Sequence, residues 1–319
     1  MKVFVAGGTG AIGSQLVPQL AAAGHEVVAT SRSAKGAEAV QRLGAEPAIA
    51  DGLDEQAMTE AVRRAQPEVV IHEMTALAGK MDLRHFDRYF ATTNQLRTKG
   101  TDHLIRAAQA VGARRLIVQS YAGWPTVRAG GAVTTEEDPL DPDPPRWMRE
   151  SMAAFRHLEG AVPAAEGLEG VVLRYGGLYG PDTGALSSEA LELIRKRQFP
   201  VVGDGAGVWS FVYTGDAASA TVAALDSGAA GIYNVVDDDP APTREWLPYL
   251  AEVIGARPPR RVPAWLGRII AGDVPVTMMT EIRGASNAKA KRELGWQPRY
   301  PSWREGFAAE ARPAESATR

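Results

Sequence analysis

The segment VFVAGGTGAIGSQL, residues 3 to 16, constrains the fold more than any other part of the chain. An apolar run typical of a buried strand leads into three spaced glycines, and a helical pattern follows. Because glycine has no side chain, the backbone amides at the helix N-terminus can approach a pyrophosphate closely. The spacing is a weak motif alone, but its place between a first strand and a first helix predicts a dinucleotide site. We expect cofactor contacts from Gly7, Thr9, Gly10, Ala11, Ile12 and Gly13.

Short apolar runs alternate with longer helical patterns through the first half of the chain. The runs KVFVAG, HEVVAT, EPAIA, PEVVIH, RRLIVQS and LEGVVLRYG are typical of buried parallel strands. This rhythm predicts an α/β fold with a Rossmann-type, doubly wound parallel sheet. The pattern becomes irregular beyond Gly176. We therefore expect a dinucleotide-binding domain over 1–175 and a smaller C-terminal substrate-binding lobe over most of 176–319, with some later segments returning to the first domain.

Composition excludes several classes of function. Lys and Arg number 35 against 38 Asp and Glu, a net charge of −3, which gives no broad electrostatic surface for nucleic acid. There is no cysteine, the five histidines show no metal-ligand spacing, and no apolar run approaches the ~20 residues of a membrane span. We expect a cytoplasmic protein with a small-molecule substrate, no metal and no nucleic-acid or membrane partner, either monomeric or a homodimer.

The end of the second strand indicates which cofactor is bound. A free ribose 2'-hydroxyl is usually met there by a carboxylate, but this chain has Thr30, Ser31 and Arg32. No anion repels a 2'-phosphate, and a guanidinium is available to bind it, so NADP(H) is favoured over NAD(H). The alternative is that Arg32 is a solvated loop charge. After the third strand, Asp51 either accepts from the adenine amine or caps the helix that begins near Asp54.

Motifs along nearly the whole chain resemble one known family. They include the glycine segment, ADGLD at 50–54, VVIHEMTA at 69–76, KGTDHLIRAAQAVGARRLIVQS at 99–120, LRYGGLYGP at 173–181, VVGDG at 201–205, FVYTGDAASA at 211–220, GIYNVVDDDP at 231–240 and AKRELGWQPRY at 290–300. These resemble the extended short-chain dehydrogenase/reductases of the NAD-dependent epimerase/dehydratase group. The resemblance implies further cofactor contacts at Gly52, Met74, Thr75 and Ala76.

The same resemblance exposes a missing catalytic pair. In this family a Ser or Thr ends the fifth strand, and a Tyr-x-x-x-Lys pair on the next helix handles the proton and holds the nicotinamide ribose. Ser120 matches the first role. Aligning the family's following glutamate with Glu159 puts Ser151 at the tyrosine and Phe155 at the lysine. A shift by one residue gives Met152 and Arg156, which still supplies no acid.

Two other positions depart from the family pattern. Arg97 stands where the family has an asparagine, and Trp209 stands where an arginine usually grips a nucleotide-sugar phosphate. An indole cannot neutralise a diphosphate, so nucleotide sugars are disfavoured. We expect catalysis from Ser120, which binds a substrate oxygen, and from Arg97, which stabilises negative charge. Tyr121 either donates the proton or packs its ring at the mouth of the sheet.

Two functions from different classes fit these residues. The first is an NADP(H)-dependent oxidoreductase with a non-standard proton donor, acting on a small apolar or aromatic carbonyl or alkene. Its pocket walls would come from Trp124, Tyr175 and Trp209, although Trp is also common in half-buried packing. The second is a catalytically degenerate NADP(H)-binding sensor or scaffold. A nucleotide-sugar epimerase or dehydratase is a further alternative.

Overall fold

A computed structural model describes residues 1–77, 85–181 and 183–311. Seven parallel strands form one sheet in the order β13-β7-β5-β4-β1-β2-β3, so the order reverses between β1 and β4. This is the predicted Rossmann-type sheet, with its ligand crevice expected at that reversal. The strands are β1 (Lys2–Ala6), β2 (Glu26–Ser31), β3 (Glu46–Ile49), β4 (Val69–His72), β5 (Arg115–Tyr121), β7 (Glu169–Tyr175) and β13 (Gly231–Val235).

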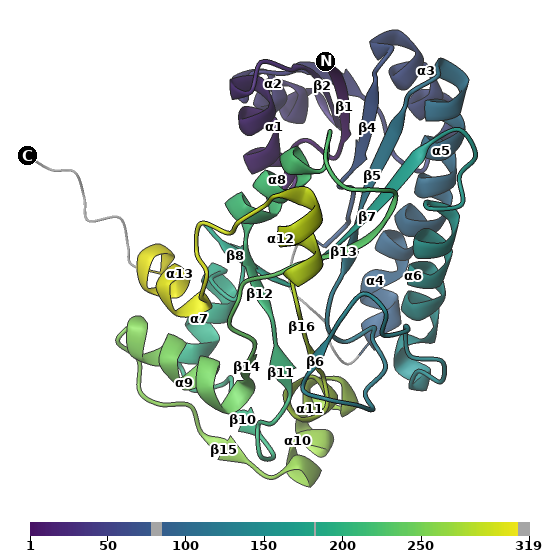
Figure 1. The fold of residues 1–319 in the computed structure, drawn as a ribbon. Coiled ribbons are helices and arrows are strands. Elements are labelled where there is room, and N and C mark those ends of the chain that lie inside the picture. Colours follow the sequence, from purple (N-terminus) through teal and green to yellow (C-terminus); the bar gives the residue numbers. More distant parts are fainter. Residues whose placement is uncertain (78–84, 182, 312–319) are drawn as a thin grey trace, which may run out of the picture.

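Helices cover both faces of this sheet (Figure 1). Successive strand side chains point to opposite faces, so Val3 and Val5 join one apolar layer while Phe4 joins the other. The first layer is completed by α1 (Gly13–Ala22), α2 (Ala34–Arg42), α8 (Thr214–Ala223) and α12 (Ala288–Leu294). The second layer is completed by α3 (Glu55–Ala65), α5 (Thr101–Val111) and α6 (Arg149–Ala161), and α4 (Phe86–Gln95) packs beside α6.

The C-terminal lobe has its own core of aromatic side chains. Trp246, Trp303 and Phe307 are buried there around Phe211. Its helices are α7 (Ser188–Arg195), α9 (Thr243–Val253), α10 (Ala264–Ala271), α11 (Asp273–Thr280) and α13 (Trp303–Glu310). Its short strands are β8 (Gly177–Gly180), β9 (Thr183–Gly184), β10 (Val201–Val202), β11 (Val208–Trp209), β12 (Phe211–Tyr213), β14 (Ala241–Pro242) and β15 (Arg261–Val262).

Several segments cross between the two parts of the chain. β13 and α8 return to the large sheet, and β6 (Val133–Thr134) pairs with β16 (Gly284–Ala285). The side chain of Arg283 donates to the carbonyl oxygens of Val127 and Ala129 and pairs with Asp138 at 2.9 Å. The segment 127–138, which follows β5, is thereby tied to the second lobe. Within the described residues, no helix is long and apolar enough to span a bilayer.

Candidate active site

The glycine loop after β1 has the close backbone packing that its sequence predicts. A Cβ on Gly13 would lie 2.2 Å from the carbonyl oxygen of Gly7, and Gly7 itself has a φ of +100°. The loop therefore needs glycine at both positions. Thr9, Gly10 and Ala11 are exposed, the Ile12 side chain is in the core, and the first turn of α1 has no acidic residue. These features fit a pyrophosphate at the helix N-terminus.

The end of β2 contributes two side-chain hydrogen bonds to the surrounding backbone and one exposed cation. The hydroxyl of buried Thr30 accepts from the Gly7 amide at 2.9 Å, which fixes the loop to the strand. Ser31 donates to the Ser33 carbonyl at 2.8 Å. Arg32 is exposed and makes no ion pair with any residue that the structure describes. Its guanidinium is therefore available to a ligand, and the 2'-phosphate contact stays a prediction.

The carboxyl ends of β3 and β4 form a tightly packed floor. Asp54 is the cap of α3, because its carboxylate accepts from the Ala57 amide; Asp51 instead accepts from the Leu53 amide. The capping alternative for Asp51 is therefore wrong, and its adenine contact remains a prediction. A Cβ on Gly52 would lie 2.4 Å from the Met74 sulfur. Thr75 is half-buried, and the Ala76 amide donates to Thr93.

His72 links this floor to the turn that follows α4. Its Nδ1 accepts from the Met74 amide, so Nε2 carries the hydrogen and donates to the Leu96 carbonyl at 3.2 Å. Burial lowers the pKa of His72 to about 4, and the ring is neutral. The strand end and the turn are thus held together.

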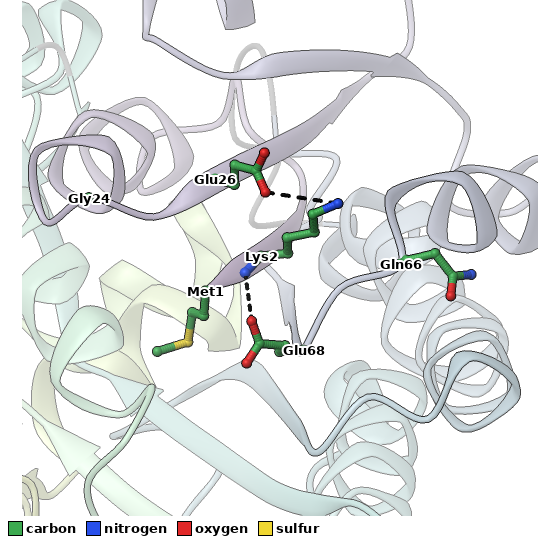
Figure 2. A pocket seen from close by; sticks show the side chains of 6 residues that line it. All are labelled: Met1, Lys2, Gly24, Glu26, Gln66 and Glu68. Carbon is green, nitrogen blue, oxygen red and sulfur yellow. Dashed lines mark hydrogen bonds and ion pairs between the residues drawn. The ribbon is translucent and has the colours of Figure 1, made fainter.

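A hollow of about 500 Å³ lies at the opposite end of β1. Met1, Lys2, Gly24, Glu26, Gln66 and Glu68 line it. Figure 2 shows Lys2 between two carboxylates, with its backbone nitrogen donating to Glu68 and its ammonium 3.9 Å from Glu26. Ligands of doubly wound sheets bind at the carboxyl ends of the strands. We therefore do not assign a function to this hollow.

The register that places Ser151 and Phe155 at the two catalytic positions stays a prediction, because Met152 of the alternative register is buried as well. Ser151, Phe155 and Glu159 recur every four residues, and all three are buried on one side of α6. Arg156, the cation in the alternative register, is exposed and donates to the Asp141 carbonyl. The inward side of α6 therefore has neither a phenol nor an ammonium at these positions.

Ser151 is held by neighbouring polar side chains. Its hydroxyl donates to the Asp87 carboxylate at 2.9 Å and accepts from the Asn94 amide at 3.0 Å. The hydroxyl hydrogen of Ser151 is therefore already used in the hydrogen bond to Asp87. Sequence reasoning missed this network, because Asp87 and Asn94 match no motif.

Arg97 lies against Phe155. It sits on a π-helical turn, Leu96–Gly100, between α4 and α5. Its guanidinium carbon is 4.0 Å from the centroid of the Phe155 ring, and its Nη1 donates to the Asn94 side chain at 3.3 Å. Burial lowers the pKa of Arg97 to about 9, so the group is protonated at neutral pH.

The Ser120 hydroxyl is bound within the protein. It donates to Glu159 at 2.7 Å, and Glu159 also forms a two-pronged ion pair with Arg174, with distances of 2.9 and 2.5 Å. All three side chains are buried. Alternation along β5 points Ser120 toward α6, the same face as Val118. Its contact with substrate stays a prediction and requires that it leave Glu159.

Tyr121, the last residue of β5, borders an aromatic cluster. The cluster consists of Phe86, Tyr89, Phe90, Tyr121, Trp124, Trp147, Phe155 and Trp209. Tyr121 is half-buried, its ring lies 5.8 Å from that of Trp124, and no described residue hydrogen-bonds its hydroxyl. Burial raises the pKa of Tyr121 above its usual range, so the phenol keeps its proton. Both the donor role and the packing role stay open.

The three residues expected in the pocket wall occupy different surroundings. Trp124 is buried, with its ring 5.3 Å from Phe155. Trp209 is half-buried, stacks on Phe211 at 6.0 Å and donates to the Met278 carbonyl. It therefore joins the aromatic cluster to the second lobe. Tyr175 is in the core beneath α8, and a substrate contact by it stays a prediction.

Glu73 is a buried carboxyl that sequence reasoning overlooked. It follows β4, beneath the glycine loop, where a Cβ on Gly7 would meet its backbone at 2.8 Å. Tyr175 donates to one carboxyl oxygen at 3.0 Å, and the other oxygen has no partner. Burial raises the pKa of Glu73 to about 8, against the effect of that bond. The sequence pattern that could have identified Glu73 is an acidic residue directly after an apolar strand.

No metal centre is evident in the described parts of the chain. Groups of three or more His, Asp or Glu side chains placed to hold an ion do not occur there. The geometry instead presents an open helix N-terminus, a buried guanidinium and an aromatic cluster near the carboxyl ends of the strands.

Comparisons with known proteins agree with this geometry. The sequence model of the NAD dependent epimerase/dehydratase family matches residues 3–236. A 3-diazoavenalumate denitrifying reductase from Streptomyces sp is 44% identical, over 97% of this chain and 100% of its own. A 4-hydroxy-2-methyl-3-oxo-4-farnesyl-3,4-dihydroquinoline-1-oxide ketoreductase from Stigmatella aurantiaca is 27% identical, over 94% and 92%.

Among solved structures, the UDP-glucose 4-epimerase of Thermus thermophilus in complex with NAD is similar. Its TM-score is 0.74 at 28% identity, covering 98% of each chain. The match extends over both lobes and includes the cofactor-binding sheet. The chain therefore belongs to the NAD dependent epimerase/dehydratase family, as an NAD(P)-dependent oxidoreductase or epimerase-like enzyme with the short-chain dehydrogenase/reductase fold.

Proposed function

We propose that this enzyme is an NADP(H)-dependent reductase of small aromatic substrates whose reaction needs no proton from helix α6. The observation that carries the proposal is the inward side of that helix. Ser151 and Phe155 stand where an acid and its lysine would be, and neither is an acid at neutral pH. A reaction that still proceeds there must be one that tolerates their absence.

Reductive loss of a diazo group is such a reaction. When bound, NADPH supplies a hydride that forms the new C–H bond of an aromatic diazonium carbon, while the C–N electron pair leaves with N2. Charge and atoms balance without an added proton. The Streptomyces relative is named as a denitrifying reductase of a diazo compound, which supports this substrate class.

The residues present divide the work of binding between two regions. The glycine loop and the N-terminus of α1 would hold the pyrophosphate, and Arg32 would hold the 2'-phosphate. The aromatic cluster around Trp124 would exclude water and stack on a flat substrate. Trp209 stands where the family has a phosphate-gripping arginine, and it favours a flat aromatic ring over a nucleotide sugar.

Reduction of a ketone or alkene is the second candidate. The free hydroxyl of Tyr121 supports it, because the phenol keeps its proton and faces the aromatic cluster. The ketoreductase relative from Stigmatella aurantiaca supports it as well. In that reaction Tyr121 would donate the proton and Ser120 would bind the carbonyl oxygen.

One assay separates these functions. Purified protein is mixed with NADPH and, in parallel, with an aromatic diazo carboxylate, an aryl ketone or UDP-glucose, each beside an enzyme-free control. We expect NADPH oxidation with equal release of N2 and formation of the unsubstituted arene. Oxidation with the ketone alone would favour the second candidate. Conversion of UDP-glucose would indicate an epimerase, and tight NADPH binding without any turnover would indicate a sensor.

A further inference from the structure

Two residues that depart from the family pattern lie in contact with each other. Phe155 on α6 stands at the position of the family's lysine, and Arg97 on the π-helical turn stands at the position of an asparagine. The guanidinium carbon of Arg97 lies 4.0 Å from the centroid of the Phe155 ring. Helix α6 has no lysine at Phe155. Arg97, on the turn between α4 and α5, places a positive charge beside that residue instead.

The charge of Arg97 is not neutralised inside the protein. Arg97 is 7% exposed, and its Nε has no hydrogen-bond partner among the described residues. Across residues 1–77, 85–181 and 183–311, no carboxylate lies within ion-pair distance of it. The nearby Glu159 is bound by Arg174 and Ser120. Burying a cation without a counter-charge costs free energy of folding. A bound ligand that accepts hydrogen bonds from Arg97 would offset that cost.

Neighbouring side chains hold the guanidinium in one place. Phe90 lies on a second side of it, with the ring centroid 5.8 Å from the guanidinium carbon. Asn94 accepts from its Nη1 and donates to Ser151, which is bound in turn to Asp87. An arginine fixed in this way loses little further entropy when it binds oxygen atoms of a ligand.

The π-helical turn also adjoins the floor of the cofactor site. The His72 ring donates to the carbonyl of Leu96, the residue before Arg97, and a Cβ on Gly52 would lie 2.8 Å from the Leu96 side chain. Gly52 and Met74 are at the carboxyl ends of β3 and β4, the edge where ligands of such sheets bind. Departures from α-helical pitch frequently mark functional sites.

We propose that Arg97 binds the hydroxyls of the nicotinamide ribose, in the place that the family resemblance assigns to a lysine on α6. This inference rests on the nicotinamide cofactor of the proposed function and not on its substrate. It replaces the transition-state role that the sequence suggested for Arg97. In this proposal the lysine that tunes a phenol is replaced by an arginine that only holds the cofactor, because guanidinium forms two parallel hydrogen bonds and stays protonated at neutral pH.

The test measures cofactor binding by calorimetry in four proteins: wild type, Arg97→Met, Arg97→Asn and the double variant Arg97→Asn/Phe155→Lys. Each is titrated with NADPH and with 2',5'-ADP, which lacks the nicotinamide ribose. We expect Arg97→Met and Arg97→Asn to bind NADPH about 10- to 100-fold more weakly, the range of charge-assisted hydrogen bonds. Their affinity for 2',5'-ADP should be unchanged, and thermal unfolding should show that both are folded.

The double variant restores the family's arrangement and should regain most of the lost NADPH affinity, to within about fivefold of wild type. Unchanged NADPH affinity in Arg97→Met overturns the inference, as does an equal loss for 2',5'-ADP, which would indicate a distorted loop. Failure of Phe155→Lys to rescue in a folded double variant overturns the shared position of the two cations. A folded wild type that binds neither ligand would overturn the proposed function and this inference together.

Discussion

The glycine loop and helix α6 differ in how closely they match the family pattern that the sequence resembles. In the loop, Gly7 and Gly13 meet backbone atoms so closely that no other residue fits. On α6, Ser151 and Phe155 take the places of the two proton-handling residues and are packed as firmly as any core side chain. The contrast fits our proposal that the chain binds the cofactor in the loop and takes no proton from α6.

The largest effect is expected from filling the loop. A methyl group at Gly13 would lie 2.2 Å from the Gly7 oxygen, so Gly13→Ala should lower the free energy of unfolding by roughly 3 kcal/mol and abolish NADPH binding. Gly160→Ala on α6 is the matched control, because a Cβ there meets nothing within 4 Å. It should be neutral or stabilising by up to about 1 kcal/mol. Urea unfolding measures the free energy of unfolding of both variants. An equal loss of stability in the two variants would show that the loop does not require glycine more than α6 does.

A second effect concerns the buried carboxyl beneath the loop. The folded protein holds the Glu73 proton up to a pKa of about 8, whereas an unfolded chain releases it near 4.5. Between these values the folded state binds one proton more, so stability should fall as pH rises from about 4.5 to 8. The scale is about 1.4 kcal/mol for each unit of pKa difference.

Replacing Glu73 with glutamine tests this directly. The amide keeps an acceptor for Tyr175 and cannot ionise, so Glu73→Gln should be more stable than wild type at pH 8 and nearly equal to it at pH 4.5. Urea unfolding at several pH values measures both. A parallel pH dependence in the two proteins would show that Glu73 ionises normally.

A smaller effect is expected at the edge of the cofactor site. Arg32 has no ion-pair partner in the described chain, so Arg32→Ala should leave stability unchanged. It should weaken NADPH binding at least about tenfold and leave NADH binding nearly unaltered. Arg42, exposed in the last turn of α2, offers a control substitution of the same kind. A wild type that prefers NADH would contradict the cofactor assignment.

The smallest effect should follow from changing α6 itself. Ser151→Ala removes a hydroxyl whose hydrogen is bound to Asp87, so we expect turnover within about threefold of wild type. Stability should fall by about 1 kcal/mol through the lost hydrogen bonds. Steady-state kinetics on the diazo substrate measure the first quantity. A loss of turnover of about 100-fold or more would show that Ser151 takes part in catalysis.

Sequence patterns predicted the sheet and the glycine loop because both depend on local regularities. Alternating apolar runs specify strands, and glycines between a strand and a helix specify a close backbone turn. Each of these features is determined by residues that lie close together in the sequence.

Contacts between distant segments were beyond such patterns. The sequence marked Arg97 and Phe155 as separate departures, and only the packing of the π-helical turn, Leu96–Gly100, against α6 shows that they touch. It likewise matched Ser120 to a catalytic serine without showing that Glu159 and Arg174 bind it. Side-chain partners depend on tertiary geometry, which no local period encodes.

The central claim is that hydride transfer here needs no proton from the protein. Its most direct test is the single-turnover rate of NADPH oxidation by an aromatic diazo carboxylate, compared in H2O and D2O from pH 6 to 8. The account predicts equal rates in the two solvents and no dependence on pH, unaltered in Tyr121→Phe. A rate at least about twofold slower in D2O, with a pH dependence that disappears in Tyr121→Phe, would show that this phenol donates a proton in the rate-limiting step and would contradict the account.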